Sequence, residues 1–337
     1  MSARWDKSPA FPSQKHLFLL PFLLFCLPAP AQDVFTGVAR VVAVGDVHGD
    51  YAQFAAVLRE AGILDRKDKW AGGKSHFVQT GDLVDRGPDS RKVMDLMIAL
   101  EKQSAKAGGR VHALIGNHEA MNVYGDQRYT DPGEYAAFHN EKSEAVRDYF
   151  WQQYAELMKK DPAAAPLDEA ARKKWDAGHP LGFFEHRIAF LPDGAYGKWV
   201  RGHNAAVKIN DTLFVHGGIS PAYAAMSLTA INEQVRKELD GAVPPPEAMI
   251  LSDDGPLWYR GLSEGDEQAL RAHVDAVLTN FGVKRIVAGH TVMKGGVAMR
   301  FEGRVIVIDT GLSKAYGGTP SALILEAGTT RVVLARH

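Results

Sequence analysis

Residues 40–49 read Arg-Val-Val-Ala-Val-Gly-Asp-Val-His-Gly. A short apolar run followed at once by glycine and polar side chains indicates a buried strand that ends in a tight turn. Two further runs, His76 to Gln79 and Val111 to Ile115, lead in the same way to Asp82 and Asn117. Asp46 and Asp82 are 36 residues apart, and Asp82 and Asn117 are 35 apart. Each interval is long enough for a strand, a crossover helix and the next strand. We therefore predict successive parallel βαβ units and an α/β fold.

The other elements are predicted from hydrophobic periodicity. Helical spacing covers Tyr51 to Ala61 and a second segment from about Pro88 to just before Gly108. From Tyr124 to Leu191 the sequence is helical, aromatic and charged, and we predict a helical insertion there. The elements predicted beyond the insertion are a helix from about Asp266 to Phe281 and strands at Ala206 to Ile209, Leu213 to Val215, Arg285 to Ala288, Val297 to Phe301, Val305 to Ile308 and Ala322 to Leu325.

The first 31 residues have the pattern of a signal peptide. Three basic side chains precede the apolar run Leu17 to Leu27, and the small-residue pattern Ala29-Pro30-Ala31 follows it. The apolar run is shorter than the roughly 20 residues that a membrane-spanning helix needs. We expect cleavage, no membrane span in the mature protein, a periplasmic or secreted location, and a catalytic domain formed by residues 32–337. An uncleaved anchor and a lipoprotein modified at Cys26 are the alternatives.

Composition narrows the possible chemistry. Cys26 is the only cysteine, and it lies in the segment expected to be removed. The mature chain then has no disulfide, thiolate zinc site or cysteine nucleophile, so any metal must be held by His, Asp, Glu or Asn. The whole chain has a formal charge of −1, of which residues 1–31 contribute +2 (three basic side chains against Asp6), leaving −3 for the rest. This balance implies no nucleic-acid partner, and it leaves the oligomeric state open.

Side chains that can bind metal follow five of the predicted strands. Loops at the carboxyl ends of the strands of an open α/β sheet converge, and ligands bind there. Each candidate falls within a few residues of a strand end, in a turn that contains glycine, so we expect them to meet around a shared site. The six candidate metal ligands are Asp46, His48, Asp82, Asn117, His216 and His290.

These turns resemble the ordered signature of the calcineurin-like metallophosphoesterases, in the branch of the phosphoprotein phosphatases. The motifs are Gly45-Asp46-Val47-His48-Gly49, Gly81-Asp82-Leu83-Val84-Asp85-Arg86-Gly87, Gly116-Asn117-His118-Glu119, His216-Gly217-Gly218 and Gly289-His290. Within that branch the chain is most similar to the Shewanella-like protein phosphatases, through residues 255–261 and the ending Asp309-Thr310-Gly311-Leu312-Ser313. The resemblance implies a β-sandwich of mixed sheets flanked by helices.

The resemblance also implies a two-metal centre. One ion would be held by Asp46 and His48, and the other by Asn117, His216 and His290, with Asp82 bridging the two. Paired ions lower the pKa of a bound water enough to make hydroxide near neutral pH, which would attack phosphorus in line. Manganese is our expectation, with iron or zinc as alternatives, because oxygen and imidazole ligands suit all three.

Four further residues have roles implied by the resemblance. His118 would donate a proton to the leaving oxygen, and Asp85 would orient its imidazole. Arg86 and Arg260 would bind phosphate, since a planar guanidinium meets two phosphate oxygens at once. Asp85 could instead cap its turn, and Arg260 could be an exposed ion-pair arginine.

The sequence indicates the type of reaction more clearly than it indicates the substrate. We expect a phosphomonoesterase acting on phosphorylated serine, threonine or tyrosine in proteins or peptides. Tyr124, Tyr129 or Phe138 could stack on a phenyl ring and favour phosphotyrosine, or they could belong to the core. The alternatives are a hydrolase of dinucleoside polyphosphates, a broad-specificity phosphoesterase, or a non-catalytic binding protein. The last would show decay among the six candidate ligands or at His118, and the sequence shows none.

One loop departs from the broader phosphatase family. Where those enzymes carry Ser-Ala-Pro-Asn-Tyr-Cys, the loop bound by okadaic acid and microcystin, this chain has Gly-Leu-Ser-Lys-Ala-Tyr-Gly-Gly at residues 311–318. We therefore expect both toxins to inhibit this protein poorly.

Overall fold

The computed structural model describes residues 32–161, 165, 167–241 and 243–335. The predicted signal peptide, residues 1–31, lies outside the described residues, so its cleavage stays a prediction. Among the residues that are described, no helix has both the length and the apolar character needed to cross a bilayer.

The first three predicted strands lie side by side in a five-stranded sheet with the order β11-β10-β2-β3-β4. Strands β2, β3 and β4 are parallel to one another, which confirms the predicted βαβ units. Strand β10 pairs antiparallel with both β2 and β11, so the sheet is mixed. The bounds are β2 Arg40–Val44, β3 His76–Gln79, β4 Arg110–Ala113, β10 Ser321–Glu326 and β11 Thr329–Leu334.

A second, six-stranded sheet has the order β1-β5-β6-β7-β9-β8. Strands β5 and β6, both predicted, form a hairpin around Asn210 and Asp211, and β6, β7 and β9 are parallel. The bounds are β1 Val34–Phe35, β5 Ala206–Ile209, β6 Thr212–Val215, β7 Arg285–Ala288, β8 Ala298–Arg300 and β9 Val305–Val307. The short 3₁₀ helix Phe301–Gly303 joins β8 to β9.

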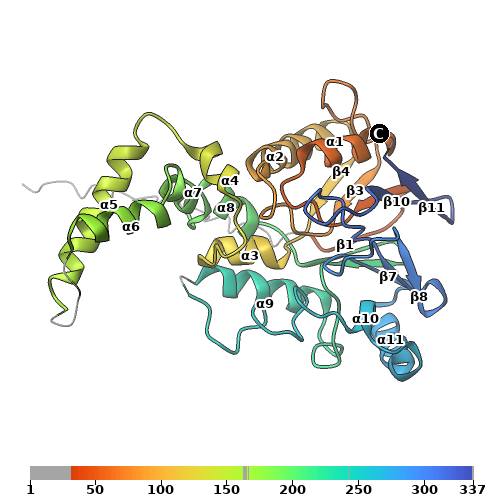
Figure 1. Ribbon diagram of the computed structural model, residues 1–337. Coiled ribbons are helices and arrows are strands. Elements are labelled where there is room, and N and C mark those ends of the chain that lie inside the picture. The colour runs from red at the N-terminus through yellow and green to blue at the C-terminus, as the bar shows by residue number, and fades with distance from the viewer. Residues whose placement is uncertain (1–31, 162–164, 166, 242, 336–337) are drawn as a thin grey trace, which may run out of the picture. The chain divides into compact units, whose positions relative to one another are not determined.

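The two sheets pack face to face, and helices cover their outer faces. Alternate strand residues such as Val41, Val78, Phe214 and Val287 are buried in one cluster between the sheets, as the two-residue repeat of a strand requires. Figure 1 shows α1 and α2 on the side of the five-stranded sheet and α10 and α11 beside the other one. The bounds are α1 Tyr51–Glu60, α2 Ser90–Lys106, α9 Leu228–Asp240, α10 Gly261–Glu264 and α11 Glu267–Phe281. This is the mixed-sheet sandwich that we predicted.

The segment between β4 and β5 is helical. Helices α5 and α6 extend away from the sheets, while α3 and α8 lie close to them (Figure 1). Aromatic stacking joins α5 to α6, with the ring centroids of Tyr154 and Trp175 4.8 Å apart. The bounds are α3 Asn117–Tyr124, α4 Pro132–Phe138, α5 Ser143–Met158, α6 Glu169–Gly178, α7 Phe183–Phe190 and α8 Ala195–Arg201.

Two strands were missed, and the end of β4 differs from the prediction by two residues, whereas the ends of the other predicted strands agree to within one residue. The short strand β1 and the C-terminal strand β11 were not predicted, although β11 pairs with β10 along all six of its residues. Strand β4 ends at Ala113 instead of Ile115, because Leu114 bridges to Asn204 and the Ile115 amide donates to the Asn204 carbonyl. The chain thus leaves the five-stranded sheet early, and Asn117 lies four residues beyond its strand instead of two.

Candidate metal centre and active site

The six predicted ligands converge at one edge of the two sheets. His216 Nε2 lies 2.8 Å from Asn117 Oδ1 and 3.4 Å from Asp82 Oδ2. His48 Nε2 lies 3.7 Å from the same Asp82 oxygen and 3.9 Å from Asp46 Oδ2. All of these side chains are buried. Residues up to 244 positions apart therefore meet around Asp82, and the main-chain amide of His290 also donates to Asp46 Oδ1.

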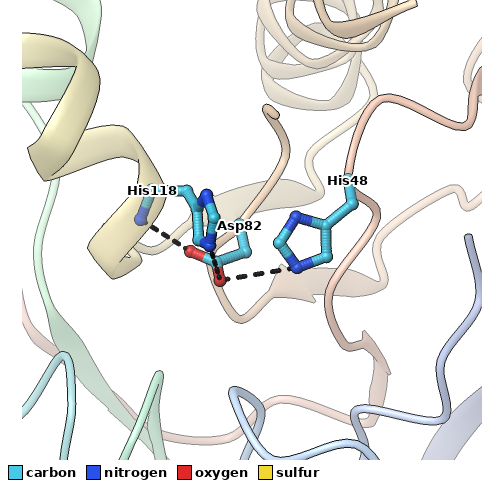
Figure 2. Close-up of side chains that lie close together, drawn as sticks. All are labelled: His48, Asp82 and His118. Atoms are coloured by element: carbon cyan, nitrogen blue, oxygen red, sulfur yellow. Dashed lines mark hydrogen bonds and ion pairs between the residues drawn. The ribbon is translucent and has the colours of Figure 1, made fainter. Parts of the chain in front are cut away.

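Asp82 belongs to two groups of side chains that could hold a metal ion. The first consists of His48, Asp82 and His118, and the second of Asp82, His216 and His290. Within each group the ligand atoms lie within 4.8 Å of one another. Figure 2 shows both imidazoles of the first group beside the Asp82 carboxylate, with a ring nitrogen of His48 and one of His118 directed at the same carboxylate oxygen. A shared central carboxylate is the arrangement that a bridging ligand needs.

The backbone at this edge is unusual. His48, Asp82, Asp85, Arg86 and His290 all have positive φ angles, between 45° and 69°. This conformation is uncommon for residues other than glycine and costs roughly 1–3 kcal/mol when the surroundings impose it. The concentration of such residues indicates that the fold holds these turns in place for a functional reason.

Two glycines allow the turns to approach each other. A Cβ atom at Gly116 would lie 2.2 Å from Asp82 Oδ1, and one at Gly289 would lie 2.5 Å from Asp46 Oδ1. Any side chain at either position would displace a central carboxylate, so close backbone approach is a condition of the site.

Main-chain carbonyls fix the orientation of two imidazoles. His48 Nδ1 lies 3.1 Å from the Val84 carbonyl, and His216 Nδ1 lies 2.8 Å from the Thr80 carbonyl. A proton on Nδ1 satisfies each carbonyl and leaves Nε2 with a free lone pair directed at the cluster. Metal-binding histidines use this arrangement, because the outer hydrogen bond fixes the tautomer.

The charges of the cluster fit a cation. Burial raises the pKa of Asp46 well above its usual range, and the nearby carboxylates of Asp309 and Asp82 add to the effect. Burial lowers the pKa of His290 to about 2, and its buried Nε2 has no hydrogen-bond partner among the described residues. Buried carboxylates beside neutral imidazoles and an unpaired nitrogen are what divalent metal ions require of their ligands, so the residues present fit divalent metal ions.

His118 and Asp85 form a buried pair beside the cluster. His118 Nδ1 lies 2.6 Å from Asp85 Oδ2. The other Asp85 oxygen accepts hydrogen bonds of 3.1 Å from Asn122 Nδ2 and Thr130 Oγ1. Burial lowers the pKa of His118, but Asp82 and Asp85 outweigh it and hold that pKa above its usual value. The imidazole can therefore carry a proton next to the cluster, with Nε2 3.9 Å from Asp82 Oδ2.

Both predicted phosphate-binding arginines border the cluster, and their side chains are exposed. Arg86 lies over the ring of Tyr129, with Cζ 4.0 Å from the ring centroid. Arg260 Nη1 donates to the His290 carbonyl at 2.8 Å and to Thr291 Oγ1 at 3.2 Å. These hydrogen bonds tie Arg260 to the turn of a predicted ligand, and Arg260 has no ion pair among the described residues, so the structure does not support the ion-pair alternative.

Two residues that support the site were not predicted. Glu119 Oε2 accepts from the Asp82 and Gly116 amides and Oε1 from the Leu83 amide, which ties two of the turns together. Asp309 is buried beside Asp46, and burial raises its pKa to about 6. Both residues lie inside the quoted motifs, so their positions were visible in the sequence, although their roles were not.

The chain matches the family described as calcineurin-like phosphoesterase over residues 39–294. It is 32% identical to Shewanella-like protein phosphatase 2 of Arabidopsis thaliana, over 87% of this chain and 76% of the relative. Among solved structures, the cold-active protein-tyrosine phosphatase of a psychrophilic Shewanella species is 28% identical, with a TM-score of 0.69, over 91% of this chain and 83% of that one. A symmetrical bis(5'-nucleosyl)-tetraphosphatase of Buchnera aphidicola is similar over only 77 residues, 23% of each chain.

A family match over most of the chain, a sandwich of two mixed sheets and a buried cluster of histidine and aspartate ligands all agree. The chain therefore belongs to the calcineurin-like phosphoesterases, metal-dependent hydrolases of phosphate esters, and is a homologue of the Shewanella-like protein phosphatases.

Proposed function

We propose that this chain is a protein phosphatase that hydrolyses phosphomonoesters on phosphorylated proteins or peptides. The observation that carries the proposal is the pairing of His118 with Asp85 next to a cluster centred on Asp82. A proton donor beside a metal cluster suits ester hydrolysis, and a non-catalytic binding protein would not need it. The names of the relatives, two of them protein phosphatases, support phosphorylated proteins as substrates.

We assign Asp46, His48 and Asp82 to one ion, and Asp82, Asn117, His216 and His290 to the second. Bound divalent ions would supply a water of lowered pKa and would offset the negative charge of phosphate oxygens. We propose manganese, with iron or zinc as alternatives. Metal analysis of the purified protein, together with the rise in melting temperature on adding each metal back after chelation, tests the assignment without relying on activity.

The protein groups divide the remaining tasks. His118, charged and held by Asp85, donates the proton that the leaving oxygen needs. Arg86 and Arg260 hold the non-bridging phosphate oxygens, because the guanidinium groups border the cluster and can each donate two hydrogen bonds. Burial of the cluster removes competing water and strengthens each of these charge interactions.

A substrate panel tests the function. We expect the metal-loaded protein to release phosphate from p-nitrophenyl phosphate and from phosphopeptides, and to act slowly on diadenosine tetraphosphate. A higher kcat/KM for the dinucleotide than for every phosphopeptide would favour the alternative reaction. The short similarity to a tetraphosphatase gives that alternative little support.

We also propose that the protein is exported after cleavage behind Ala31. The support is the charge and apolar pattern of residues 1–31. Expression in a bacterial host, followed by cell fractionation and intact-mass measurement, tests it. A protein that keeps its first 31 residues in the cytoplasm would rule the proposal out.

A further inference from the structure

Two tyrosine rings from distant loops pack around Arg86. Tyr129 lies in the loop before α4, and Tyr316 lies in the loop after β9. Arg86 Cζ is 4.0 Å from the centroid of the Tyr129 ring and 5.9 Å from that of Tyr316. Each ring also contacts an imidazole of the cluster: Tyr129 is 5.2 Å from His118, and Tyr316 is 5.2 Å from His48. The two rings thus border the place where a phosphate ester must enter.

Neither ring is a core residue. Both are half-buried, and neither phenol hydroxyl has a hydrogen-bond partner within the described part of the chain. Tyr316 lines an open hollow of about 600 Å³ together with Val292, Met293 and Val297. Arg86 lines a second hollow of about 360 Å³. Tyr316 therefore faces open space, and Tyr129 packs against an arginine that borders open space.

The other two aromatic candidates from the sequence do not border the site in this way. Tyr124 packs against the buried core. Phe138, the last residue of α4, contacts His186 and Arg91 with its ring. Of the three aromatic candidates, only Tyr129 lies beside both His118, the proposed proton donor, and Arg86, a proposed phosphate-binding arginine.

The position of His118 fixes where the leaving group lies. A proton donor must be within hydrogen-bond reach of the oxygen that it protonates. The group attached to that oxygen therefore starts next to His118, and Tyr129 is the aromatic wall at that point. A flat aryl group can stack on this ring, whereas the single methylene of a serine ester offers too little surface to do so. The ring of Tyr316, whose centroid is 5.9 Å from Arg86 Cζ, provides the second aromatic wall.

We infer that Tyr129 is a specificity-determining residue which, with Tyr316 as the second wall, forms an aromatic slot that selects aryl over alkyl phosphate esters. This inference rests on the proposed phosphatase function and adds to it the feature that distinguishes phosphotyrosine from phosphoserine. The slot acts on the leaving group alone, because phosphate itself is held by the arginines. It therefore changes the ratio of kcat/KM values between substrates, and it leaves the affinity for free phosphate unaltered.

The test replaces each ring and measures the ratio of kcat/KM for aryl substrates to kcat/KM for alkyl substrates. Tyr129→Leu removes the ring and keeps apolar bulk, while Tyr129→Phe keeps the ring and serves as the matched control. Tyr316→Leu tests the second wall, and Tyr149→Leu, at an exposed tyrosine of α5, controls for loss of a surface ring. Substrates are one peptide carrying phosphotyrosine or phosphoserine at the same position, and the small pair phenyl phosphate and glycerol 2-phosphate. Inhibition by inorganic phosphate reports on Arg86.

We expect Tyr129→Leu to lower kcat/KM for the aryl substrates about 3- to 10-fold, the worth of one aromatic contact. The alkyl substrates should change by less than about 2-fold. Tyr129→Phe and Tyr149→Leu should keep the wild-type ratio, Tyr316→Leu should lower it less, and the inhibition constant for phosphate should not move.

If Tyr129→Leu lowers kcat/KM equally for aryl and alkyl substrates, or weakens inhibition by phosphate, then Tyr129 only holds Arg86 in position. The slot would then be rejected. An unchanged ratio in both leucine variants would reject it as well. A wild type that hydrolyses phenyl phosphate but neither peptide would instead reject the proposed protein phosphatase. In that case the slot would be judged on the ratio for the small pair alone.

Discussion

Replacing His118 by Asn should slow the reaction in proportion to how poor the leaving group is. An alkoxide must be protonated as it departs, and loss of a positioned acid typically costs about 100- to 10,000-fold in rate. A p-nitrophenolate leaves without help, so the same variant should lose far less rate with p-nitrophenyl phosphate. We therefore expect kcat for a phosphoserine peptide to fall at least about 100-fold, while kcat for p-nitrophenyl phosphate falls much less.

Asp85→Asn gives a second, graded perturbation of the same step. The hydrogen bond of 2.6 Å between His118 Nδ1 and Asp85 Oδ2 is buried, and a hydrogen bond to a charged group is worth about 1.5–3 kcal/mol. This corresponds to a loss of about 10- to 150-fold for a poor leaving group. Thr130 and Asn122 still hold the side chain at position 85, so the variant removes charge more than position.

The pH profile gives the sign of the effect. Asp82 and Asp85 hold the pKa of His118 above its usual value against the effect of burial, and the acid form is the active one. Removing the Asp85 charge lowers that pKa, so the alkaline limb of kcat should move to lower pH. Kinetics across a series of aryl and alkyl esters, at pH values from about 5 to 10, measure both effects. Equal losses for all leaving groups, with an unmoved alkaline limb, would refute the role of His118 as proton donor.

Three other predictions address the metals, the stability and the inhibitors. Asp82→Asn should lower the metal content measured by elemental analysis and reduce kcat at least about 100-fold, whereas retained activity would count against a shared bridging carboxylate. Burial lowers the pKa of His186 to about 4, so on acidification His186 is protonated in the unfolded chain before it is protonated in the folded one. About 3 kcal/mol of the free energy of unfolding, present above pH ~6.5, should therefore be lost as the pH falls towards 4. A His186→Gln variant should show a flatter dependence of melting temperature on pH. Okadaic acid and microcystin should inhibit poorly because residues 311–318 lack the toxin-binding sequence, and nanomolar inhibition of phosphate release would contradict this.

The sequence predicts the centre of the site because of how parallel strands end. A glycine-containing turn directly after an apolar run places a short polar side chain at a known edge of the sheet, so Asp46, Asp82, His216 and His290 can be located without tertiary information. The same reasoning misplaced the end of β4, because Leu114 bridges to Asn204 and the Ile115 amide donates to the Asn204 carbonyl. Periodicity reports that a residue is buried, and it does not report which neighbour it pairs with.

The walls of the site could not be predicted in the same way. Tyr129 and Tyr316 lie in loops without a repeat, and both rings lie near Arg86, with Cζ 4.0 Å and 5.9 Å from their centroids. Strand β11 escaped prediction for a related reason. Its residues Thr329 to Leu334 alternate only weakly and are mostly exposed, so little in the pattern distinguishes an edge strand from a polar tail.

The loop between α3 and α4 supports the proposed catalytic residues. The Tyr129 carbonyl accepts a hydrogen bond of 3.0 Å from the Arg86 amide, and Thr130 holds the oxygen of Asp85 that His118 does not use. Tyr129 thus supports Arg86, the proposed phosphate-binding arginine, and Thr130 supports Asp85, which holds the proposed proton donor. Helix α4 begins at Pro132, three residues after Tyr129, so this loop connects the proposed catalytic residues to the helices that follow.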